Sequence, residues 1–436
     1  MAWDFSNDPE FQETLDWIWD FVENEIRPID VIQEELGKPQ LDQLTAPLKE
    51  EVKRRKLWAA HLDPELGGQG LGQLKLALMH EILGRYSIAP EVFGNQAPDS
   101  GNSELLAVGA TEEQKDRWMW PLLDGKLRSC FSMTEPHVAG SDPTLIQTRA
   151  VRDGDDWVIN GHKWFASNAS TADFLIVMVV TDPDAAPHRR AAMIVVENPT
   201  PGMKIVRNVG TMSHPYPSAY KREGRGGGHA EILFEDCRVP LDHMIGQPGE
   251  GFLLAQKRLG GGRIHHAMRL LGQAKRAFDM LCERALSRES HGRTLRDHQM
   301  VQDFIAESAI DIETARLLTL KAAWTMDSTG AANSRKEIAM IKYYGAKVAY
   351  NVIDRSIQVH GALGYTTDLP LEGMYRQCRA LRIADGADEV HKVTIAKNVL
   401  RDYEAVEGWP SEHIPTRREE AIRRFGHLVD LHTENL

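Results

Sequence analysis

Asp385 and Gly386 are the neighbouring residues of this chain best suited to moving a proton next to a carbonyl group. They follow the segment RALRI at 379–383, so a carboxylate stands beside an accessible backbone N–H. The carboxylate can act as a general base, and the N–H of Gly386 can stabilise the oxyanion that develops as the proton leaves. An Asp-Gly pair is also typical of a plain turn. The rest of the chain therefore decides between a base and a turn.

Composition limits the classes of protein to consider. The 436 residues, 42% hydrophobic and 26% charged, are enough for two or three domains. The net charge of −12 predicts no attraction to nucleic acid or to an anionic membrane surface. We find no signal peptide and no apolar run long enough to insert into a membrane. The cysteines form no C-x-x-C pair, which indicates reduced thiols in the cytoplasm and no metal site: Cys130, Cys237, Cys282 and Cys378.

The spacing of apolar residues changes twice along the chain. The first part has helical spacing and a capping box between Thr111 and Gln114. The second consists of short runs rich in branched residues, which are typical of strands. The third contains four long helical segments, which predict an antiparallel bundle. We therefore expect an α+β protein with an N-terminal helical domain, a middle β-barrel or sandwich domain, a C-terminal four-helix bundle and a C-terminal extension, at 1–128, 129–245, 246–406 and 407–436.

Three local features of this order can be checked against a structure. Asn160-Gly161 carries the signal of a tight β-hairpin. A loop at 214–229 is rich in Gly, Pro and basic residues that suit phosphate groups, namely Lys221, Arg222 and Arg225. The expected bundle helices run over about 252–288, 297–328, 334–362 and 386–406.

Four motifs stand in a fixed order on this helical, β, helical background. No G-x-G-x-x-G follows a strand, which argues against a dinucleotide-binding Rossmann domain. The motifs are FSMTEP with GSD at 131–142, NGHKWFASN at 160–168, RESHG at 288–292 with Gln299, and QVHGALGY at 358–365 followed by Tyr375-Arg376 and Asp385-Gly386. Together they resemble the acyl-CoA dehydrogenase family over nearly the whole chain.

The resemblance implies FAD as the cofactor, bound between two copies of the chain. Phe165 would stack on the isoalloxazine, and Thr134 and Ser167 would hydrogen-bond the flavin. Arg288 and Gly361 would reach the adenosine-diphosphate half of a neighbouring subunit's FAD, because arginine pairs with diphosphate and glycine permits close backbone approach. The implied cofactor-binding residues are Phe131, Met133, Thr134, Gly140, Ser141, Phe165, Ser167, Arg288, His291, Gln299, Gln358, Gly361, Ala387 and Glu389.

The same resemblance assigns the chemistry. Asp385 aligns with the family's base, which is usually Glu, and would take the α-proton of an acyl-CoA thioester while the flavin takes the β-hydride. The N–H of Gly386 would bind the thioester oxygen, and Arg263 could hold the carboxylate of the base. The product would be a trans-2-enoyl-CoA. An electron-transfer flavoprotein would reoxidise the flavin, and the assembly would be a homodimer or homotetramer.

A narrower resemblance points to one subgroup of the family. NQAPDSGN at 95–102 and IADGADEVH at 383–391 resemble the members that in animals are fused to an aminoglycoside-phosphotransferase-like kinase domain, with stand-alone bacterial relatives. That subgroup is linked to 4-hydroxyacyl-CoA breakdown, which gives 4-hydroxy- or 4-phosphoacyl-CoA as an alternative substrate. Three departures from the family pattern are the Asp base, His291 in place of Phe, and one extra residue before Ser141.

Two further readings stay open at this point. A flavin oxidase of the nitroalkane-oxidase type has the same fold and also uses an Asp base. Some relatives bind DNA through a basic patch and have lost dehydrogenase activity, although the acidic net charge and the carboxylate at Asp385 argue against this here.

Overall fold

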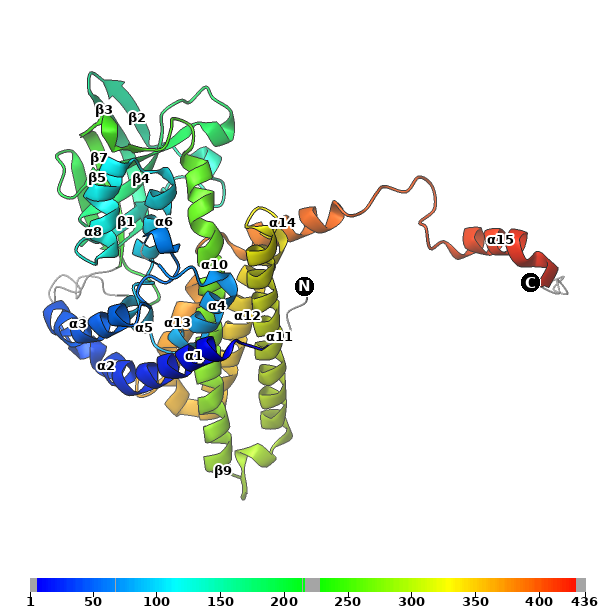
Figure 1. Ribbon diagram of the computed structural model, residues 1–436. Helices are drawn as coiled ribbons and strands as arrows, with labels where there is room; N and C mark the ends of the chain where they lie inside the picture. The colour runs from blue at the N-terminus through cyan, green and yellow to red at the C-terminus, as the bar shows by residue number, and fades with distance from the viewer. Residues whose placement is uncertain (1–5, 67, 214, 216–227, 429–436) are drawn as a thin grey trace.

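The computed structural model describes residues 6–66, 68–213, 215 and 228–428. The described chain forms a group of N-terminal helices, a β-sheet domain and a bundle of long helices, with α10 running from the sheet through the bundle (Figure 1). The α-helices are α1 Pro9–Phe21, α2 Arg27–Ile32, α3 Lys38–Arg54, α4 Gly72–Leu83, α5 Ala89–Val92, α6 Asp99–Gly109, α7 Glu112–Gln114, α8 Trp120–Leu123, α10 Gly251–Ser287, α11 Gln299–Thr329, α12 Arg335–His360, α13 Leu371–Ala380, α14 Asp388–Leu400 and α15 Ile414–Phe425. This order confirms the predicted fold class.

Local hydrogen bonds fix where the N-terminal helices begin. The Asp8 side chain accepts from the N–H of Phe11 at 2.8 Å and caps α1. The predicted capping box is confirmed, because the Thr111 hydroxyl accepts from the N–H of Gln114 at 3.3 Å while the Gln114 side chain accepts from the N–H of Thr111 at 2.9 Å. The Gln114 amide also donates to the carbonyls of Asp242 and Met244, which ties this helix to the β domain.

The middle domain is one twisted sheet with buried strands at its centre. Its order is β6-β7-β3-β2-β4-β5-β8, and β1 pairs in parallel with β4. All seven residues of β4 are buried because one face packs on the sheet's own core and the other on α6, α8 and α10. The strands are β1 Ser129–Ser132, β2 Arg149–Asp153, β3 Asp156–Ser167, β4 Phe174–Val180, β5 Ala191–Glu197, β6 Met203–Val209, β7 His229–Pro240 and β8 Met244–Ile245.

The hairpin predicted at Asn160-Gly161 is wrong. The two residues lie inside β3, which pairs continuously with β2 on one side and, with a bulge at this point, with β7 on the other. The chain reverses instead between β2 and β3, where Gly154 has φ +63°. Glycine is needed at 161 for a different reason, since a Cβ there would lie 2.4 Å from Oγ1 of Thr148.

Three of the four predicted bundle helices are long in the structure. α10, α11 and α12 pack through small and branched side chains such as Ala267, Ala349 and Val352. The fourth, expected over 386–406, is the shorter α14, which begins at Asp388 and ends at Leu400. An additional short helix, α13, precedes it. None of the described helices has the length and apolar content needed to span a membrane.

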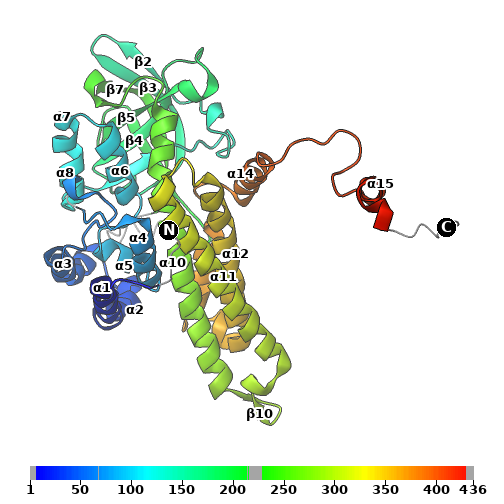
Figure 2. The ribbon, with the colours of Figure 1, turned by 45° about the vertical axis from the view of Figure 1, so that its right-hand side comes forward.

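The C-terminal extension leaves the body of the molecule. After α14, residues 401–413 have no regular secondary structure except turns and bends, and α15 follows. Figures 1 and 2 show this segment reaching away from the bundle in both views.

Candidate active site

Asp385 lies in a turn between α13 and α14. This turn, residues 381–387, is called the Asp385 turn below. Asp385 has φ +54° and Gly386 φ +102°, so both residues occupy the half of conformational space that glycine favours. The consecutive positive φ angles explain why no helix continues through this segment. The carboxylate is partly exposed, and its Oδ2 lies 3.7 Å from Nε2 of His266 on α10.

Three side chains hold the backbone of the Asp385 turn. Nε and Nη2 of Arg263 donate to the carbonyl oxygen of Asp385 at 3.3 and 3.2 Å, and Nε2 of His391 lies 3.3 Å from the same oxygen. The ammonium of Lys342 donates to the carbonyl of Leu381 and, at 3.4 Å, to that of Gly386. Arg263 was predicted to hold the carboxylate of Asp385; its hydrogen bonds fix the backbone of that residue instead.

Burial lowers the pKa of all three groups, but only His391 loses its charge. It lowers the pKa of His391 to about 4, with Arg263 and Lys342 adding to the effect, so His391 is neutral near pH 7 and donates from Nε2. Burial also lowers the pKa of Lys342 and of Arg263, and in both cases the charge of Asp385 opposes the shift. The turn therefore carries cationic donors around its carbonyl oxygens.

Glycine at 386 is required by space as well as by φ. A Cβ at this position would lie 2.8 Å from Nε2 of His391. Sequence reasoning placed Gly386 at the site but assigned no role to His266, Lys342 or His391. The signal available for them was weak, since a histidine on an amphipathic helix and a lysine within a bundle helix usually have structural roles.

A second group of predicted residues gathers where β1, β3 and β7 meet. The ring of Phe165, at φ +50° and 40% exposed, stands between Trp164, 4.8 Å away edge-on, and His229, stacked at 5.2 Å. The hydroxyl of Ser167 lies 2.9 Å from Nδ1 of His229. An exposed aromatic ring held at a strand end suits stacking on a flat heterocycle.

A buried ion pair fastens the segment after β1 to β3. Lys163 donates to the carbonyl of Met133 at 2.8 Å and to Glu135 at 2.9 Å, and the N–H of Trp164 donates to the carbonyl of Thr134 at 3.0 Å. Burial lowers the pKa of Lys163 to about 8 against the opposing charge of Glu135. The neighbouring predicted residues differ in exposure: Phe131 is partly buried, and Gly140 and Ser141 are exposed.

A third group lies at the far end of the bundle. The short strands β9 Glu289–Ser290 and β10 Arg293–Thr294 mark this end, away from the sheet in Figures 1 and 2. Gly361, at φ +63°, ends α12. The predicted residues here are all exposed: Arg288, His291, Gln299, Gln358 and Gly361. One chain therefore does not bring this group together with the one around Phe165.

The last predicted residues, Ala387 and Glu389, lie where α14 begins, and the carbonyl of Ala387 accepts from the N–H of His391 at 3.3 Å. Lys221, Arg222 and Arg225 fall outside the described residues. Among the residues that the structure describes, no group of three or more His, Cys, Asp or Glu is arranged to hold a metal ion.

Comparison with known proteins identifies the family. The chain matches the acyl-CoA dehydrogenase N-terminal domain at residues 8–126, the middle domain at 130–219 and the C-terminal domain at 249–400. It is 47% identical to a Mycobacterium tuberculosis protein named "Probable acyl-CoA dehydrogenase FadE2", over 81% of this chain and 84% of that protein. The chain belongs to the acyl-CoA dehydrogenase family.

Two further relatives show the breadth of the match. Acyl-CoA dehydrogenase family member 11 of Gallus gallus is 44% identical over 81% of this chain, but the match spans only 45% of that longer protein. The butyryl-CoA dehydrogenase structure from Megasphaera elsdenii superposes with a TM-score of 0.77 at 26% identity, covering 92% of this chain and all of that one. Membership of the acyl-CoA dehydrogenase family confirms the predicted fold, the class of oxidoreductase acting on CH–CH bonds, and FAD as the cofactor of the family.

This acyl-CoA dehydrogenase also contains a buried cluster that sequence reasoning missed. The histidine cluster, as it is called below, consists of His61, His80, Asn95, His265 and Arg269. Arg269 donates to Nδ1 of His80 at 3.2 Å and to the carbonyl of Asn95 at 2.5 Å. The rings of His80 and His265 lie 4.3 Å apart, and Nδ1 of His61 lies 2.8 Å from Oδ1 of Asn95. His265 directly precedes His266 on α10, and the charge of His266 contributes to the lowered pKa of both His80 and His265, so the cluster lies near the Asp385 site.

The histidine cluster contains three buried polar atoms with no hydrogen-bond partner among the described residues: Nε2 of His80, Nδ2 of Asn95 and Nε2 of His265. Burial lowers the pKa of Arg269 to about 10. It also lowers that of His61 to about 4 and those of His80 and His265 well below the usual value. The described residues include no carboxylate among the hydrogen-bond or ion-pair partners of Arg269.

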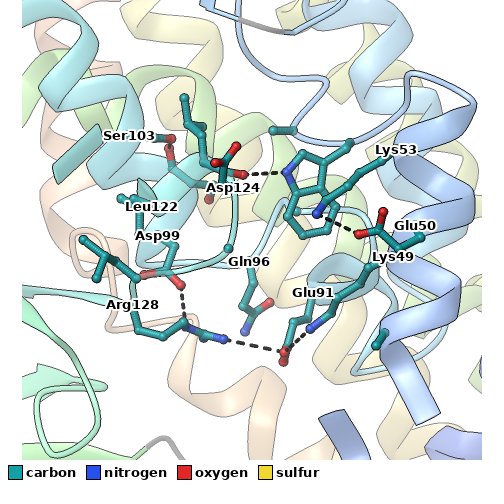
Figure 3. Close-up of a pocket in the computed structure, with 18 residues that line it drawn as sticks. Lys49, Glu50, Lys53, Glu91, Gln96, Asp99, Ser103, Leu122, Asp124 and Arg128 are labelled. Carbon is teal, nitrogen blue, oxygen red and sulfur yellow. Dashed lines mark hydrogen bonds and ion pairs between the residues drawn. The ribbon is translucent and has the colours of Figure 1, made fainter. Parts of the chain in front are cut away.

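A cavity of about 200 Å³ lies elsewhere, between α3, α6 and the segment before β1 (Figure 3). Six of its seven charged groups are paired with one another: Lys49 with Glu91 at 3.0 Å, Arg128 with Asp99 at 2.7 Å, and Lys53 with Glu50 at 3.0 Å. The seventh, Asp124, pairs with Lys126 outside the cavity. None of the predicted site residues lines it. We interpret this ion-pair network as a link between the helical and β domains.

Proposed function

We propose that this protein removes two hydrogens from the α and β carbons of an acyl-CoA thioester, forming a trans-2-enoyl-CoA, with Asp385 as the base. One observation carries the proposal: Arg263, Lys342 and His391 hold the backbone of the Asp385 turn while the carboxylate itself stays partly exposed. A base must be fixed in position yet able to reach a substrate proton. Family membership and the sheet's exposed Phe165 support the same chemistry.

Asp385 and Gly386 have separate roles in the proposed reaction. Asp385 takes the α-proton, and the N–H of Gly386 donates to the thioester oxygen, where negative charge develops. An apolar acyl chain in the site displaces water, which disfavours the charged form of the carboxylate and so strengthens it as a base. FAD, when bound, supplies the acceptor for the β-hydride. Aspartate is one methylene shorter than the usual glutamate. Its backbone must therefore lie closer to the substrate for the carboxylate to reach the α-proton.

We propose that FAD is held by residues from two copies of the chain. The two sets of predicted residues lie on the sheet and at the far end of the bundle, which favours a homodimer or homotetramer over a monomer. The residues proposed to bind FAD are Phe131, Met133, Thr134, Gly140, Ser141, Phe165, Ser167, Arg288, His291, Gln299, Gln358, Gly361, Ala387 and Glu389.

An electron-transfer flavoprotein is the proposed acceptor of the electrons. We propose a cytoplasmic location, which the thiols of Cys237, Cys282 and Cys378 support because reducing compartments preserve thiols.

The test is an anaerobic titration of the purified yellow protein with acyl-CoA thioesters. The oxidised flavin band bleaches in the wild type, whereas Asp385→Asn keeps its flavin and bleaches at least about 10³-fold more slowly because the base is lost. Asp402→Asn, a change of the same kind at an exposed position, bleaches at the wild-type rate. Unchanged bleaching in Asp385→Asn removes Asp385 as the base. Bleaching by nitroalkanes alone, or salt-dependent DNA binding without any bleaching, supports the other readings.

The histidine cluster favours a second candidate substrate, an acyl chain that bears a hydroxyl or phosphate group. Nδ1 of His80 accepts from Arg269, so the proton of this neutral imidazole is on Nε2, the atom that has no partner. The unpartnered atom of Asn95 is its amide nitrogen, also a donor. A buried guanidinium and unused donors together fit a ligand group that accepts hydrogen bonds.

Substrate preference tests this second candidate. In the wild type, kcat/KM for a 4-hydroxy- or 4-phosphoacyl-CoA exceeds that for the unsubstituted thioester of equal length. His265→Phe and Arg269→Lys lower the ratio of the two values at least about tenfold, because each disturbs a donor used by only one substrate. Equal losses on both substrates, or a wild type that prefers the unsubstituted chain, rule out the second candidate and leave the dehydrogenase proposal intact.

A further inference from the structure

The C-terminal arm, residues 401–428, lies outside the family's domains and stands away from the rest of the described chain. The match to the C-terminal domain ends at residue 400. Apart from His413, Ile422 and Gly426, every residue of the arm is exposed, and both views show α15 standing away from the bundle. Its large apolar side chains are nonetheless numerous, with exposures between 46% and 74%: Tyr403, Val406, Trp409, Ile414, Phe425 and Leu428.

α15 has one apolar stripe. Ile414, Ala421 and Phe425 recur at spacings of seven and four residues, which places them on a single face of the helix, with Arg418 and Ile422 along its second edge. Arg417 and Arg424 follow one edge of this stripe, seven residues apart. In the single chain Arg417 pairs with Glu412 of the linker and Arg424 lies over the ring of Phe425. An amphipathic helix of this kind is stabilised when its stripe packs against another surface. The described part of the chain does not supply that surface.

α11 has an outer face with the matching properties. Its inner face packs into the bundle through Ile312, Ala315 and Leu320. On the outer face Ile310 is 61% exposed and Leu317 is 38% exposed. Exposed acidic residues surround these two apolar side chains, namely Asp303, Glu307 and Glu313.

We propose that α15 of one copy docks along the outer face of α11 of a second copy. The arginines along the stripe of α15 would meet the acidic residues of α11, and Ile414 and Phe425 would cover Ile310 and Leu317. The lengths agree, because the 12 residues of α15 span about 18 Å and the stretch from Asp303 to Leu317 about 22 Å. Two copies that exchange arms in this way form a closed, symmetric pair.

Charge favours a second copy over a lipid surface as the occupant. The linker that carries α15 contains four acidic residues, which an anionic membrane would repel: Asp402, Glu404, Glu407 and Glu412. The proposal concerns residues outside the cofactor and base sites, and the contact it describes is additional to the assembly around FAD proposed above.

A cysteine pair tests the contact directly. Full-length protein carrying both Ile310→Cys and Ala421→Cys, purified with its cofactor and oxidised, gives a disulfide-linked species of twice the 49.0 kDa chain mass on denaturing gels. Either substitution alone gives no such species. Cross-linking that leaves the mass at 49.0 kDa means that the arm binds its own α11, and no cross-linking means that it docks elsewhere; both overturn the proposal.

Charge reversal tests the chemistry of the contact. Arg417→Glu with Arg424→Glu weakens self-association, measured by sedimentation, at least tenfold, and adding Glu307→Arg with Glu313→Arg restores it. Arg423→Glu, a single charge reversal on the opposite face of α15, leaves association unchanged, whereas Arg424→Glu alone already weakens it. Equal effects of Arg423→Glu and the stripe variants, or binding of the arm to phosphatidylserine vesicles without any change in association, contradict the proposal.

Discussion

The guanidinium of Arg263 contacts Asp385 at its backbone, with Nη2 3.2 Å and Nε 3.3 Å from the carbonyl oxygen. Arginine therefore acts on the turn that carries the proposed base. Hydrogen bonds that involve a charged donor contribute about 1.5–3 kcal/mol. Arg263→Ala should lower kcat by roughly 10- to 100-fold and change KM much less, because the carboxylate loses its fixed position.

Steady-state rates with an artificial electron acceptor check this prediction for Arg263. Arg263→Lys is the matched control, since it keeps the charge but lacks the two-donor fork; its kcat should fall between those of the wild type and Arg263→Ala. An Arg263→Ala protein with a normal kcat and a raised KM would show that the arginine binds substrate instead.

Gly386→Ala tests the shape of the Asp385 turn. The new Cβ would lie 2.8 Å from Nε2 of His391, in a residue with φ +102°. We expect a loss of about 1–3 kcal/mol in the free energy of unfolding, together with reduced turnover. Gly373→Ala is the control, because that helical position has nothing within 4 Å of an added Cβ and alanine favours helices. Similar urea midpoints for the two variants would contradict the strain argument.

Lys163→Met tests the buried ion pair beneath the proposed flavin site. Removing one partner of such a pair costs about 3–5 kcal/mol, because Glu135 stays buried and loses its cation. The carbonyl of Met133 loses a donor at the same time, so we also expect a lower ratio of FAD to protein by absorbance. The double variant Lys163→Met with Glu135→Gln should recover part of the stability. No recovery would show that the loss comes from packing rather than charge.

Stability should fall on mild acidification because His80 and His265 are buried as neutral side chains. Burial and the neighbouring Arg269 hold both pKa values well below 6.5, whereas the unfolded chain binds the protons near pH 6.5. Below that pH the unfolded state therefore gains protons that the folded state does not. Each histidine contributes a slope of up to about 1.4 kcal/mol per pH unit.

Urea unfolding at pH 7, 6 and 5 measures this slope. In His265→Phe the free energy of unfolding should depend less steeply on pH than in the wild type, whatever its absolute value. Replacing the exposed His427 should leave the slope unchanged. Parallel slopes in the wild type and His265→Phe would mean that His265 is protonated in the folded protein.

Local signals in the sequence predicted local structure well. The capping box at Thr111 depends on residues within one turn of each other and is found, and the bundle helix expected over about 334–362 is found at Arg335–His360. The hairpin predicted at Asn160-Gly161 is wrong. Glycine is needed at 161 because the side chain of Thr148 leaves no room for a Cβ, and Thr148 is thirteen residues away and comes close only through sheet pairing. The last bundle helix begins late because two positive φ angles at Asp385 and Gly386 interrupt it.

The surroundings of the candidate site were less accessible to sequence reasoning. His266, Lys342 and His391 come from three different helices, and their meeting at the Asp385 turn is a property of the bundle as a whole. The histidine cluster could not be predicted for the same reason, because a polar side chain can be recognised as buried only once the residues packed around it are known. Arg263 was identified by its alignment with the family, but alignment gives no information on which atom of Asp385 it contacts.

α10 is one uninterrupted helix of 37 residues that carries Arg263, His266 and Arg269 near its middle and leads to Arg288 at its C-terminal end. Each residue of a helix adds about 100° of rotation and 1.5 Å of rise. Deleting a single residue between Arg269 and Arg288 would therefore turn one end away from its partners while the other end stayed in place. Insertions and deletions within this span should survive in evolution only as combinations that preserve the angular phase, whereas the loops outside it remain free to change length.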